Sequence, residues 1–276
     1  MRTCGGTRVC SASGDGTRSF RRLAAKRVGP FREVARVLEA RVPEPGPGEV
    51  LVRVRYAGAN AGCETFRALG KHWFAGNRNV EEFALGAEGV GEVEQVGEGV
   101  EGLKAGDAVA FVGGAFAEYV IAKAVMCTPC AEASAEKVGL RISALTACSA
   151  LEGTADVQAD ETVLVTAAAG GTGHFAVQLA KARGARVVGT CGSPAKAALL
   201  RELGCDRVVN HTEENVAEVL AEEFPKGVDV VYEGVGGEML SAGLNSLAPN
   251  GRLLIIGYIS EYPHAASPSS SEPASE

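Results

Sequence analysis

The second half of the chain alternates short apolar runs with stretches whose apolar residues recur at helical spacing. Parallel strands joined by crossover helices produce this rhythm, so the sequence predicts a doubly wound α/β domain over residues 141–260. Ser193, Pro194 and Gly204 mark one of its helices with an N-cap, a first-turn proline and an exit glycine. The predicted strands are residues 163–166, 186–190, 207–209, 228–233 and 252–257.

The first half of the chain follows a different pattern, in which short apolar runs are separated by glycines. Residues 49–56 alternate apolar and polar side chains as a half-buried strand does, after a proline- and glycine-rich turn at 43–48. Strands of this kind, spaced by glycine turns, indicate a small β-barrel-type domain over residues 26–140. Further pieces of it are expected near residues 86–93, 103–109 and 115–120.

The two ends of the chain differ in composition from its body. Residues 1–25 are polar, and up to Arg22 they hold five arginines and one acidic residue. A mitochondrial transit peptide has this balance, but a disordered extension or a wrongly assigned gene start is the interpretation that we favour. Residues 261–276 are mostly Ser, Pro, Ala and Glu, so we expect a disordered tail there.

Composition narrows the class of protein. The chain has 276 residues, enough for two modest domains, and its net charge of −7 argues against nucleic acid as a partner. No apolar run is long enough to span a bilayer.

Cys127 and Cys130 form a single C-x-x-C pair, which could be a redox or half-metal motif. It lacks a second pair at zinc-site spacing, so reduced structural thiols in an intracellular compartment are the simpler interpretation.

A glycine-rich turn lies between the strand predicted at 163–166 and the helical stretch after it. Ala168, Gly170 and Gly173 occupy the three positions of a G-x-G-x-x-G fingerprint, with alanine in place of the first glycine. A phosphate can bind the free backbone N–H groups at the N-terminus of such a helix. The turn therefore predicts a dinucleotide site, although a small-residue turn without a ligand would explain the motif alone.

The next strand end indicates which dinucleotide is bound. An NAD site places an acidic residue about 20 residues beyond the first glycine, to bind the ribose hydroxyls. Residues 189–193 fall in that window and contain no acidic residue, so the 2′-phosphate of NADPH is permitted. Ser193 at a helix N-terminus and Lys196 one turn later would suit that phosphate. A solvated surface lysine is the alternative for Lys196.

These motifs and their flanks, above all residues 167–177 and 189–210, closely resemble the medium-chain dehydrogenase/reductase family. Within it, the chain is similar to the zinc-free branch of quinone oxidoreductases and prostaglandin reductases. The resemblance runs from about Lys26 to about Tyr262. It implies a GroES-like substrate domain followed by a Rossmann domain. It also implies that the sixth strand and the C-terminal return segment are missing, which would impair catalysis.

The resemblance implies a set of cofactor contacts around the Rossmann sheet. His211 stands where the family has a tyrosine for the 2′-phosphate, so this ligand departs from the family pattern. Cys148, near Thr146, replaces an aromatic residue of the family. The implied cofactor-binding residues are Thr146, Gly170, Gly171, Thr172, Gly173, Gly192, Ser193, Lys196, His211, Gly234, Ile256, Gly257 and Tyr262.

The resemblance also bears on metal binding and catalysis. Zinc-dependent members use a cysteine and a histidine where this chain has Asn60 and Ala87, so we expect no metal. In zinc-free members NADPH reduces the C=C bond of an α,β-unsaturated ketone, and a hydrogen-bond donor stabilises the enolate. Tyr262 and Asn60 are the candidates for that donor. An ordinary residue at the edge of the tail is the alternative for Tyr262.

The sequence therefore predicts an NADPH-dependent enone reductase of the 15-oxoprostaglandin 13-reductase type. A quinone oxidoreductase and a truncated, non-catalytic nucleotide-binding protein are the alternatives. The expected partner is a small enone or quinone, with neither nucleic acid nor a membrane span, and a homodimer is compatible with the resemblance. We expect a cytoplasmic location. The arginine-rich start suggests a mitochondrial alternative, and the family resemblance a peroxisomal one.

Overall fold

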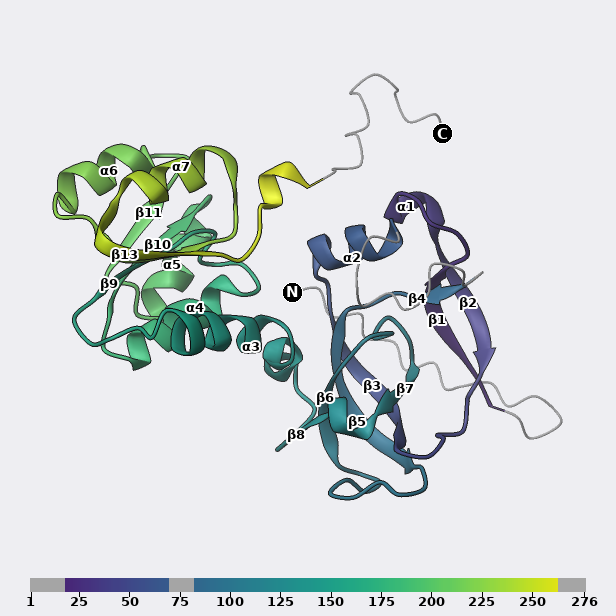
Figure 1. The fold of residues 1–276 in the computed structure, drawn as a ribbon. Coiled ribbons are helices and arrows are strands. Elements are labelled where there is room, and N and C mark those ends of the chain that lie inside the picture. The colour runs from purple at the N-terminus through teal and green to yellow at the C-terminus, as the bar shows by residue number, and fades with distance from the viewer. Residues whose placement is uncertain (1–17, 70–81, 263–276) are drawn as a thin grey trace. The chain divides into compact units, whose positions relative to one another are not determined.

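The computed structural model describes residues 18–69 and 82–262. The chain forms two compact units, one up to Arg141 and the other from Ile142 onward (Figure 1). The first unit is built on antiparallel sheets and the second on a parallel sheet. Both therefore have the class of fold that their hydrophobic patterns predict.

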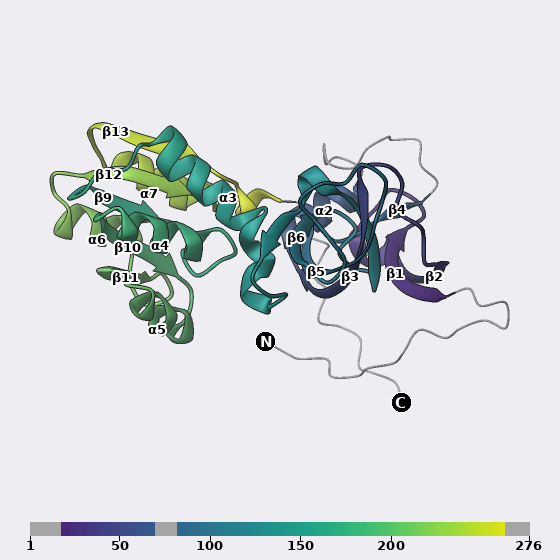
Figure 2. The ribbon, with the colours of Figure 1, turned by 90° about the horizontal axis from the view of Figure 1, so that it is seen from below.

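The N-terminal unit contains a five-stranded and a three-stranded sheet (Figure 2). The larger sheet has the order β7 (Tyr119–Lys123), β3 (Glu49–Gly58), β5 (Glu88–Val96), β6 (Ala108–Val112) and β8 (Thr128–Cys130). The smaller has the order β2 (Ala35–Arg41), β1 (Ser19–Ala25) and β4 (Phe83–Ala84). The helical pieces are α1 (Phe31–Val34), α2 (Ala61–Ala68), η1 (Ala124–Met126) and η2 (Ala135–Leu140).

Strand β3 is buried more completely than its alternating pattern predicts. Val50 and Val52 face the core of the larger sheet, as expected. Leu51 points to the opposite face and is also buried, because Phe20 and Tyr119 pack against it. The two aromatic rings meet edge to face, with centroids 5.9 Å apart. A second apolar layer, which includes Phe20 of β1, therefore covers a face that the sequence pattern assigns to solvent.

The N-terminal extension is shorter than predicted. Residues 1–25 were expected to be disordered or a targeting segment, but Ser19–Ala25 form β1, which pairs with β2 and β4. Ala24 and Ala25 are fully buried, and the arginines before them have acidic partners. Arg21 pairs with Glu118, and Arg22 with Glu82. The prediction is wrong for this strand because its arginines are paired in the fold, and residues 1–17 lie outside the described part.

The C-terminal unit is a doubly wound parallel sheet with the strand order that is typical of a Rossmann domain. That order is β11 (Arg207–Asn210), β10 (Arg186–Cys191), β9 (Thr162–Val165), β12 (Val228–Glu233) and β13 (Leu247–Ile255). All neighbouring strands are parallel. Each of the five strands that the apolar runs predict is therefore present, and β13 begins five residues earlier than expected.

Helices cover both faces of this sheet, and strand β9 shows how the faces are assigned. Val163 and Val165 pack in one core cluster with α4 (Gly173–Ala182) and α5 (Pro194–Glu202). Leu164 points the other way, into a cluster with α6 (Val216–Glu223) and α7 (Gly237–Asn245). The remaining helical pieces are α3 (Ser143–Cys148), η3 (Ser149–Thr154) and η4 (Ile259–Glu261). Helices therefore cover both faces of the sheet, and a ligand can reach it only at the ends of its strands.

Two predictions about local structure have different outcomes. Ser193 caps α5, Pro194 is its first residue, and Gly204 follows it with φ +93°, so this helix is as predicted. The disordered tail was expected to begin at residue 261, but Glu261 ends η4 and Tyr262 is placed beside it. The prediction is wrong for these two residues, because backbone hydrogen bonds in η4 hold them, and residues 263–276 lie outside the described part.

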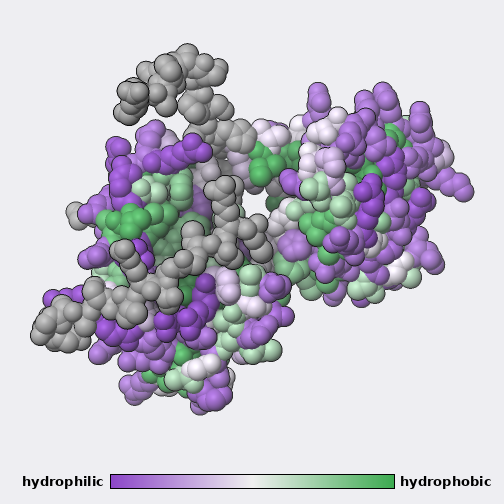
Figure 3. Space-filling model, turned by 180° about the vertical axis from the view of Figure 1, so that it is seen from behind, coloured by the Kyte–Doolittle hydropathy of each residue, from purple (hydrophilic) through white to green (hydrophobic). Residues whose placement is uncertain are grey.

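Hydrophilic side chains cover most of the face of the C-terminal unit that Figure 3 shows. Large apolar side chains are exposed in both units, among them Val125, Leu244 and Ile255. Across residues 18–69 and 82–262, no helix combines the length and apolarity that crossing a membrane requires.

Candidate cofactor site

The fingerprint turn connects β9 to α4 at the centre of the sheet. A Cβ atom at Gly173 would lie 2.5 Å from the carbonyl oxygen of Ala167 and 2.7 Å from that of Ala168. Since these are backbone atoms, they cannot move aside as a flexible side chain would, and only glycine fits. Gly173 therefore lets α4 begin directly against the end of β9, which is the part that the third fingerprint glycine plays in this motif.

The turn leaves part of its backbone available to a ligand. Gly170 N–H donates to Ala167 O at 2.8 Å, and His174 N–H donates to Gly170 O at 3.2 Å. Within the described part of the chain, no acceptor lies against the N–H groups of Gly171, Thr172 and Gly173. These three groups are at the positive end of a ten-residue helix, an arrangement that favours a phosphate or another anion.

Neighbouring strands hold the start of the turn from both sides. From β10, Thr190 accepts hydrogen bonds from Ala167 N–H at its hydroxyl (3.1 Å) and from Ala168 N–H at its carbonyl (2.9 Å). From β12, Tyr232 O accepts from Thr166 N–H at 3.0 Å. Ala167 has φ +45°, in the left-handed region that disfavours alanine, so these contacts hold a strained residue.

Four predicted cofactor residues lie at the ends of β10 and β11. A Cβ atom at Gly192 would lie 2.9 Å from Nε2 of His211, so the histidine ring rests on the glycine. Ser193 Oγ accepts a hydrogen bond from Lys196 N–H at 3.4 Å, which leaves its hydroxyl hydrogen free to donate. Lys196 is exposed, and its ammonium has no ion pair with any described residue. The structure thus brings together the residues that were assigned to the 2′-phosphate.

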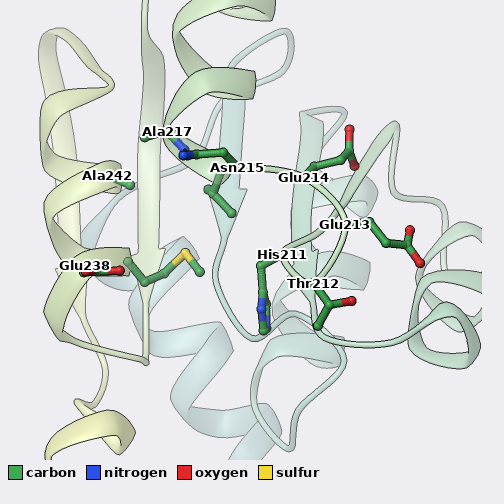
Figure 4. A pocket seen from close by; sticks show the side chains of 10 residues that line it. His211, Thr212, Glu213, Glu214, Asn215, Ala217, Glu238 and Ala242 are labelled. Atoms are coloured by element: carbon green, nitrogen blue, oxygen red, sulfur yellow. The ribbon is translucent and has the colours of Figure 1, made fainter.

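A pocket of about 700 Å³ adjoins His211 (Figure 4). The loop from His211 to Asn215 and the first two residues of α6 form one wall, and Glu238, Met239 and Ala242 of α7 form the other. Glu214, at its rim, is paired with Arg207 at 2.6 Å, and the arginine lowers the pKa of this carboxyl group. His211 follows β11 and Glu238 lies in the first turn of α7, so the pocket opens at the carboxyl ends of the strands, where ligands bind in such sheets.

A second group of predicted residues gathers at the ends of β12 and β13. The hydroxyl of Tyr262 would lie 3.2 Å from a Cβ atom at Gly257, and Gly234 O would lie 3.5 Å from it. Ile256 N–H donates to Glu233 O at 2.7 Å. Tyr262 also meets Tyr258 edge to face, with ring centroids 5.0 Å apart. The fold therefore assembles Gly234, Ile256, Gly257 and Tyr262 at one place on the sheet edge.

Thr146 stands apart from these two groups. It lies on α3, which packs against α4, and it is half-buried. Its N–H donates to Ile142 O at 2.9 Å, and its hydroxyl has no hydrogen bond with another described residue. The role of Thr146 as a nicotinamide neighbour stays a prediction.

Sequence reasoning missed Glu233 and Thr166, which are both buried at the centre of the sheet edge. The Glu233 carboxylate accepts hydrogen bonds from Thr166 Oγ (3.1 Å), Val235 N–H (2.9 Å) and Gly236 N–H (3.0 Å). The signal in the sequence is the acidic residue that ends the run of residues 228–233, at the position where the chain leaves the sheet. His174, whose Nδ1 lies 2.8 Å from Gly170 O, was also missed.

Asn60, the other catalytic candidate, belongs to the N-terminal unit, whereas Tyr262 belongs to the C-terminal one. Asn60 precedes α2, and its Nδ2 donates to Oε1 of Glu88 at 2.7 Å. The Glu88 carboxylate is only 2% exposed. This contact fixes which end of the Asn60 amide faces Glu88 and leaves the second N–H of Nδ2 for another acceptor.

The residues at the zinc positions of the family do not fit a catalytic zinc ion. Such a site takes thiolate, imidazole or carboxylate ligands and an open position. Here Asn60 offers an amide whose nitrogen donates to Glu88, and Ala87 offers a buried methyl group. Over residues 18–69 and 82–262, no three His, Cys, Asp or Glu side chains are arranged to hold a metal ion. The expectation of no metal stays a prediction.

The C-x-x-C pair consists of two free thiols that face different partners. Cys127 Sγ donates to Lys123 O and Cys130 Sγ to Thr128 O, each at 3.5 Å. Burial raises the pKa of the Cys127 thiol to about 11, which favours the protonated thiol over the nucleophilic thiolate near neutral pH. The arrangement favours the structural interpretation over a redox or metal motif.

Two family profiles match the chain. Residues 46–132 match the alcohol dehydrogenase GroES-like domain, and residues 171–272 match the zinc-binding dehydrogenases. Among curated proteins, prostaglandin reductase-3 of Mus musculus is 41% identical over 250 residues, which cover 89% of this chain and 65% of that protein. A probable quinone oxidoreductase of Leishmania amazonensis is 44% identical over 236 residues, which cover 84% and 68% of the two chains. The chain spans about two thirds of the length of these relatives.

Solved structures give the same picture. The quinone oxidoreductase of Pseudomonas syringae is similar with a TM-score of 0.76 and 34% identity, covering 87% of this chain and 74% of that one. A mycobacterial protein solved in complex with NADPH has a TM-score of 0.76 and 31% identity, with the same coverage. From its GroES-like and Rossmann units and from these relatives, the chain belongs to the medium-chain dehydrogenase/reductase family.

Proposed function

We propose that the chain acts as an NADP-dependent oxidoreductase. One observation carries this proposal: the N–H groups of Gly171, Thr172 and Gly173 have no acceptor among the described residues, at a helix N-terminus in the middle of a Rossmann sheet. A pyrophosphate would satisfy all three groups. NADPH is bound in the mycobacterial structural relative, which supports the same cofactor here.

The preference for NADPH over NADH rests on charge. The strand end at residues 189–193 contains no acidic side chain that would repel a 2′-phosphate. Lys196 supplies a cation without an ion-pair partner among the described residues, and Ser193 supplies a hydroxyl one turn earlier. Both belong to the N-terminal turn of α5, whose dipole also favours an anion.

For the substrate, we propose an α,β-unsaturated ketone whose C=C bond is reduced, as the relationship to prostaglandin reductase-3 suggests. NADPH, when bound, supplies the hydride. The contribution of the chain is to place donors where negative charge develops on the ketone oxygen. Asn60 has a free N–H on an amide that Glu88 orients, and Tyr262 has a phenolic hydroxyl beside Gly257. A 15-oxoprostaglandin is the specific substrate to test.

A quinone is the second candidate substrate, because several relatives are quinone oxidoreductases. Reduction of a quinone also places negative charge on a carbonyl oxygen, so the same donors would serve. Because the same donors would serve both substrates, the shape of the binding site has to decide between an enone and a quinone.

The test is oxidation of NADPH, followed by its absorbance, with a 15-oxoprostaglandin and with a quinone at equal concentrations. NADH replaces NADPH in a parallel series, and a full-length prostaglandin reductase-3 serves as the positive control. We expect turnover with the enone that exceeds turnover with the quinone, and a clear preference for NADPH. NADPH binding without turnover of either substrate would instead favour a non-catalytic nucleotide-binding protein.

A further inference from the structure

A fully buried carboxylate lies where the two loops of the candidate cofactor site meet. Glu233 is the last residue of β12 and has no exposed surface. Its strand lies next to β9, which leads into the fingerprint turn. A buried charge is costly unless hydrogen bonds replace water around it. The hydrogen-bond partners of Glu233 therefore show which segments of the chain its carboxylate holds in place.

Two of these partners belong to the loop that follows β12. Oε1 of Glu233 accepts from Val235 N–H at 2.9 Å, and Oε2 accepts from Gly236 N–H at 3.0 Å. Gly236 has φ +83°, in the left-handed region that glycine tolerates. The carboxylate thus folds the loop back over its own side chain and fixes the path of residues 234–236.

The third partner reaches the other loop. Thr166 follows β9 directly, and its Oγ lies 3.1 Å from Oε1 of Glu233. Oγ of Thr166 accepts a hydrogen bond from Gly234 N–H at 2.9 Å, and its hydroxyl hydrogen is shared between Glu233 Oε1 and Tyr232 O, which lies 3.3 Å away. Thr166 is therefore bound both to the Glu233 carboxylate and to the loop after β12. The next residue, Ala167, begins the strained turn whose later N–H groups have no acceptor among the described residues.

The loop after β12 is also fastened from its outer side. Ser260 of η4 donates to Val235 O through its N–H (2.9 Å) and its hydroxyl (2.6 Å). Ile259 N–H lies 3.3 Å from Gly234 O. The loop is thus hydrogen-bonded to η4 on one side and to Glu233 on the other. Among the described residues, Glu233 is the only charged side chain whose hydrogen bonds connect this loop to the start of the fingerprint turn.

We propose that Glu233 is a positioning residue that locks the fingerprint turn and the loop after β12 into one arrangement, and that this arrangement is the one that binds the dinucleotide. Thr166 passes the constraint from one loop to the other. The inference rests on the proposed function for its ligand, NADPH. The coupling between the loops is independent of it and can be measured without a ligand.

The test uses Glu233→Gln in the full chain. A glutamine has one acceptor oxygen in place of two, so either Val235 N–H or Gly236 N–H loses its acceptor. Hydrogen exchange on the ligand-free protein should become faster at Val235 and Gly236. It should also become faster at Ala167, Ala168 and Gly170, whose N–H groups are hydrogen-bonded in the fingerprint turn. The Kd for NADPH, measured by nicotinamide fluorescence, should rise about tenfold or more, the effect of losing a hydrogen bond to a charged group.

Three further variants separate positioning from general stability. Thr166→Val removes the hydroxyl that links the loops and should raise the Kd in the same way. Thr166→Ser keeps the hydroxyl and should restore the wild-type Kd. Val163→Ala is the matched control, since it removes buried volume at the opposite end of β9. It should lower the melting temperature and leave both the Kd and the exchange of the two loops unchanged.

The outcomes distinguish this inference from the proposed function. If the wild type binds NADPH and Glu233→Gln and Thr166→Val bind it equally well, the positioning role is wrong and the proposed function stands. If the wild type binds neither NADPH nor NADH, the proposed function fails. Hydrogen exchange then still decides the coupling, which is refuted if Glu233→Gln speeds exchange only at Val235 and Gly236. If Glu233→Gln does not fold, the two Thr166 variants give the answer.

Discussion

Each unit of the molecule buries a carboxylate at a loop, but the two carboxylates are satisfied to different degrees. Glu233 in the C-terminal unit has hydrogen bonds to both of its oxygens. Glu64 on α2 in the N-terminal unit is 5% exposed and accepts Gly86 N–H at Oε2 (2.9 Å). Its other oxygen has no hydrogen-bond partner within the described residues.

The difference shows what a buried charge needs from the backbone. Around Glu233 the chain turns so that two successive N–H groups point at the carboxylate, and these groups replace the lost water. Around Glu64 this replacement is incomplete, and burial raises the pKa of its carboxyl group. We therefore expect the loop after β12 to depend on a full negative charge, whereas the segment near Gly86 tolerates a neutral side chain.

The largest expected effect comes from removing each carboxylate. Glu233→Leu leaves Val235 N–H and Gly236 N–H buried without an acceptor, and each such group costs about 1–3 kcal/mol. We expect a loss of about 3 kcal/mol or more in the free energy of unfolding, measured with urea. Glu64→Leu strands Gly86 N–H and removes the carboxylate charge near the buried Arg67, and it should cost less, about 1–2 kcal/mol. Equal losses in the two variants would contradict the comparison.

The next effect comes from replacing a glycine by alanine, and it depends on whether the new methyl group meets backbone atoms or a side chain. In Gly173→Ala the new methyl group would meet Ala167 O and Ala168 O, which cannot move without opening the turn. We expect destabilisation of about 1–3 kcal/mol and loss of NADPH binding in a fluorescence titration. Gly192→Ala is the matched control. Its methyl group meets only the exposed His211 ring, so the free energy of unfolding should change by less than about 0.5 kcal/mol.

A smaller effect tests the side chain that is assigned to the 2′-phosphate. Lys196→Ala should weaken NADPH binding about tenfold, since a charge-assisted hydrogen bond contributes about 1.5–3 kcal/mol. NADH lacks the 2′-phosphate, so the Kd for NADH should stay unchanged. The NADH titration is therefore the control for the NADPH titration. Lys226, an exposed lysine in the loop before β12, gives a second control as Lys226→Ala. Equal affinity of the wild type for NADPH and NADH would contradict the assignment.

The smallest effect is a dependence of stability on pH that Glu64 should carry. Burial raises its pKa above the ordinary value of 4.5 in the folded state, so the unfolded state loses this proton at a lower pH. Stability from this group therefore falls as the pH rises from about 4.5 through the folded-state pKa. Glu64→Gln removes the effect. Its free energy of unfolding, relative to the wild type, should increase between pH 4.5 and pH 7.

Acidic residues with ion pairs are expected to act in the opposite direction. The guanidinium of Arg252 lowers the pKa of Glu161, so that contribution is lost as the pH falls. For this reason the measurement is the difference between the wild type and Glu64→Gln, in which the Glu161 contribution cancels. A difference that does not change with pH would show that Glu64 releases its proton at an ordinary pH in the folded state.

The sequence by itself determined the class of each unit and the position of the turn. The runs near residues 163–166 and 228–233 mark strands because they are short, rich in valine and followed by turns, as strands of a sheet covered on both faces are. Gly173 could be recognised from its spacing, and Ser193 as a cap from the proline that follows it. These features depend on neighbours close in the chain, so the local sequence carries them.

The tertiary structure decided the features that depend on distant partners. Arg21 and Arg22 seemed typical of an extension, but Glu118 and Glu82 pair with them and β1 joins a sheet. The link from Thr166 to Glu233 joins residues 67 positions apart in the chain. Such contacts exist only because β9 and β12 are neighbours in the sheet. The free N–H groups of the turn follow from a motif, but the charge that holds the turn to the next loop depends on how the sheet is ordered.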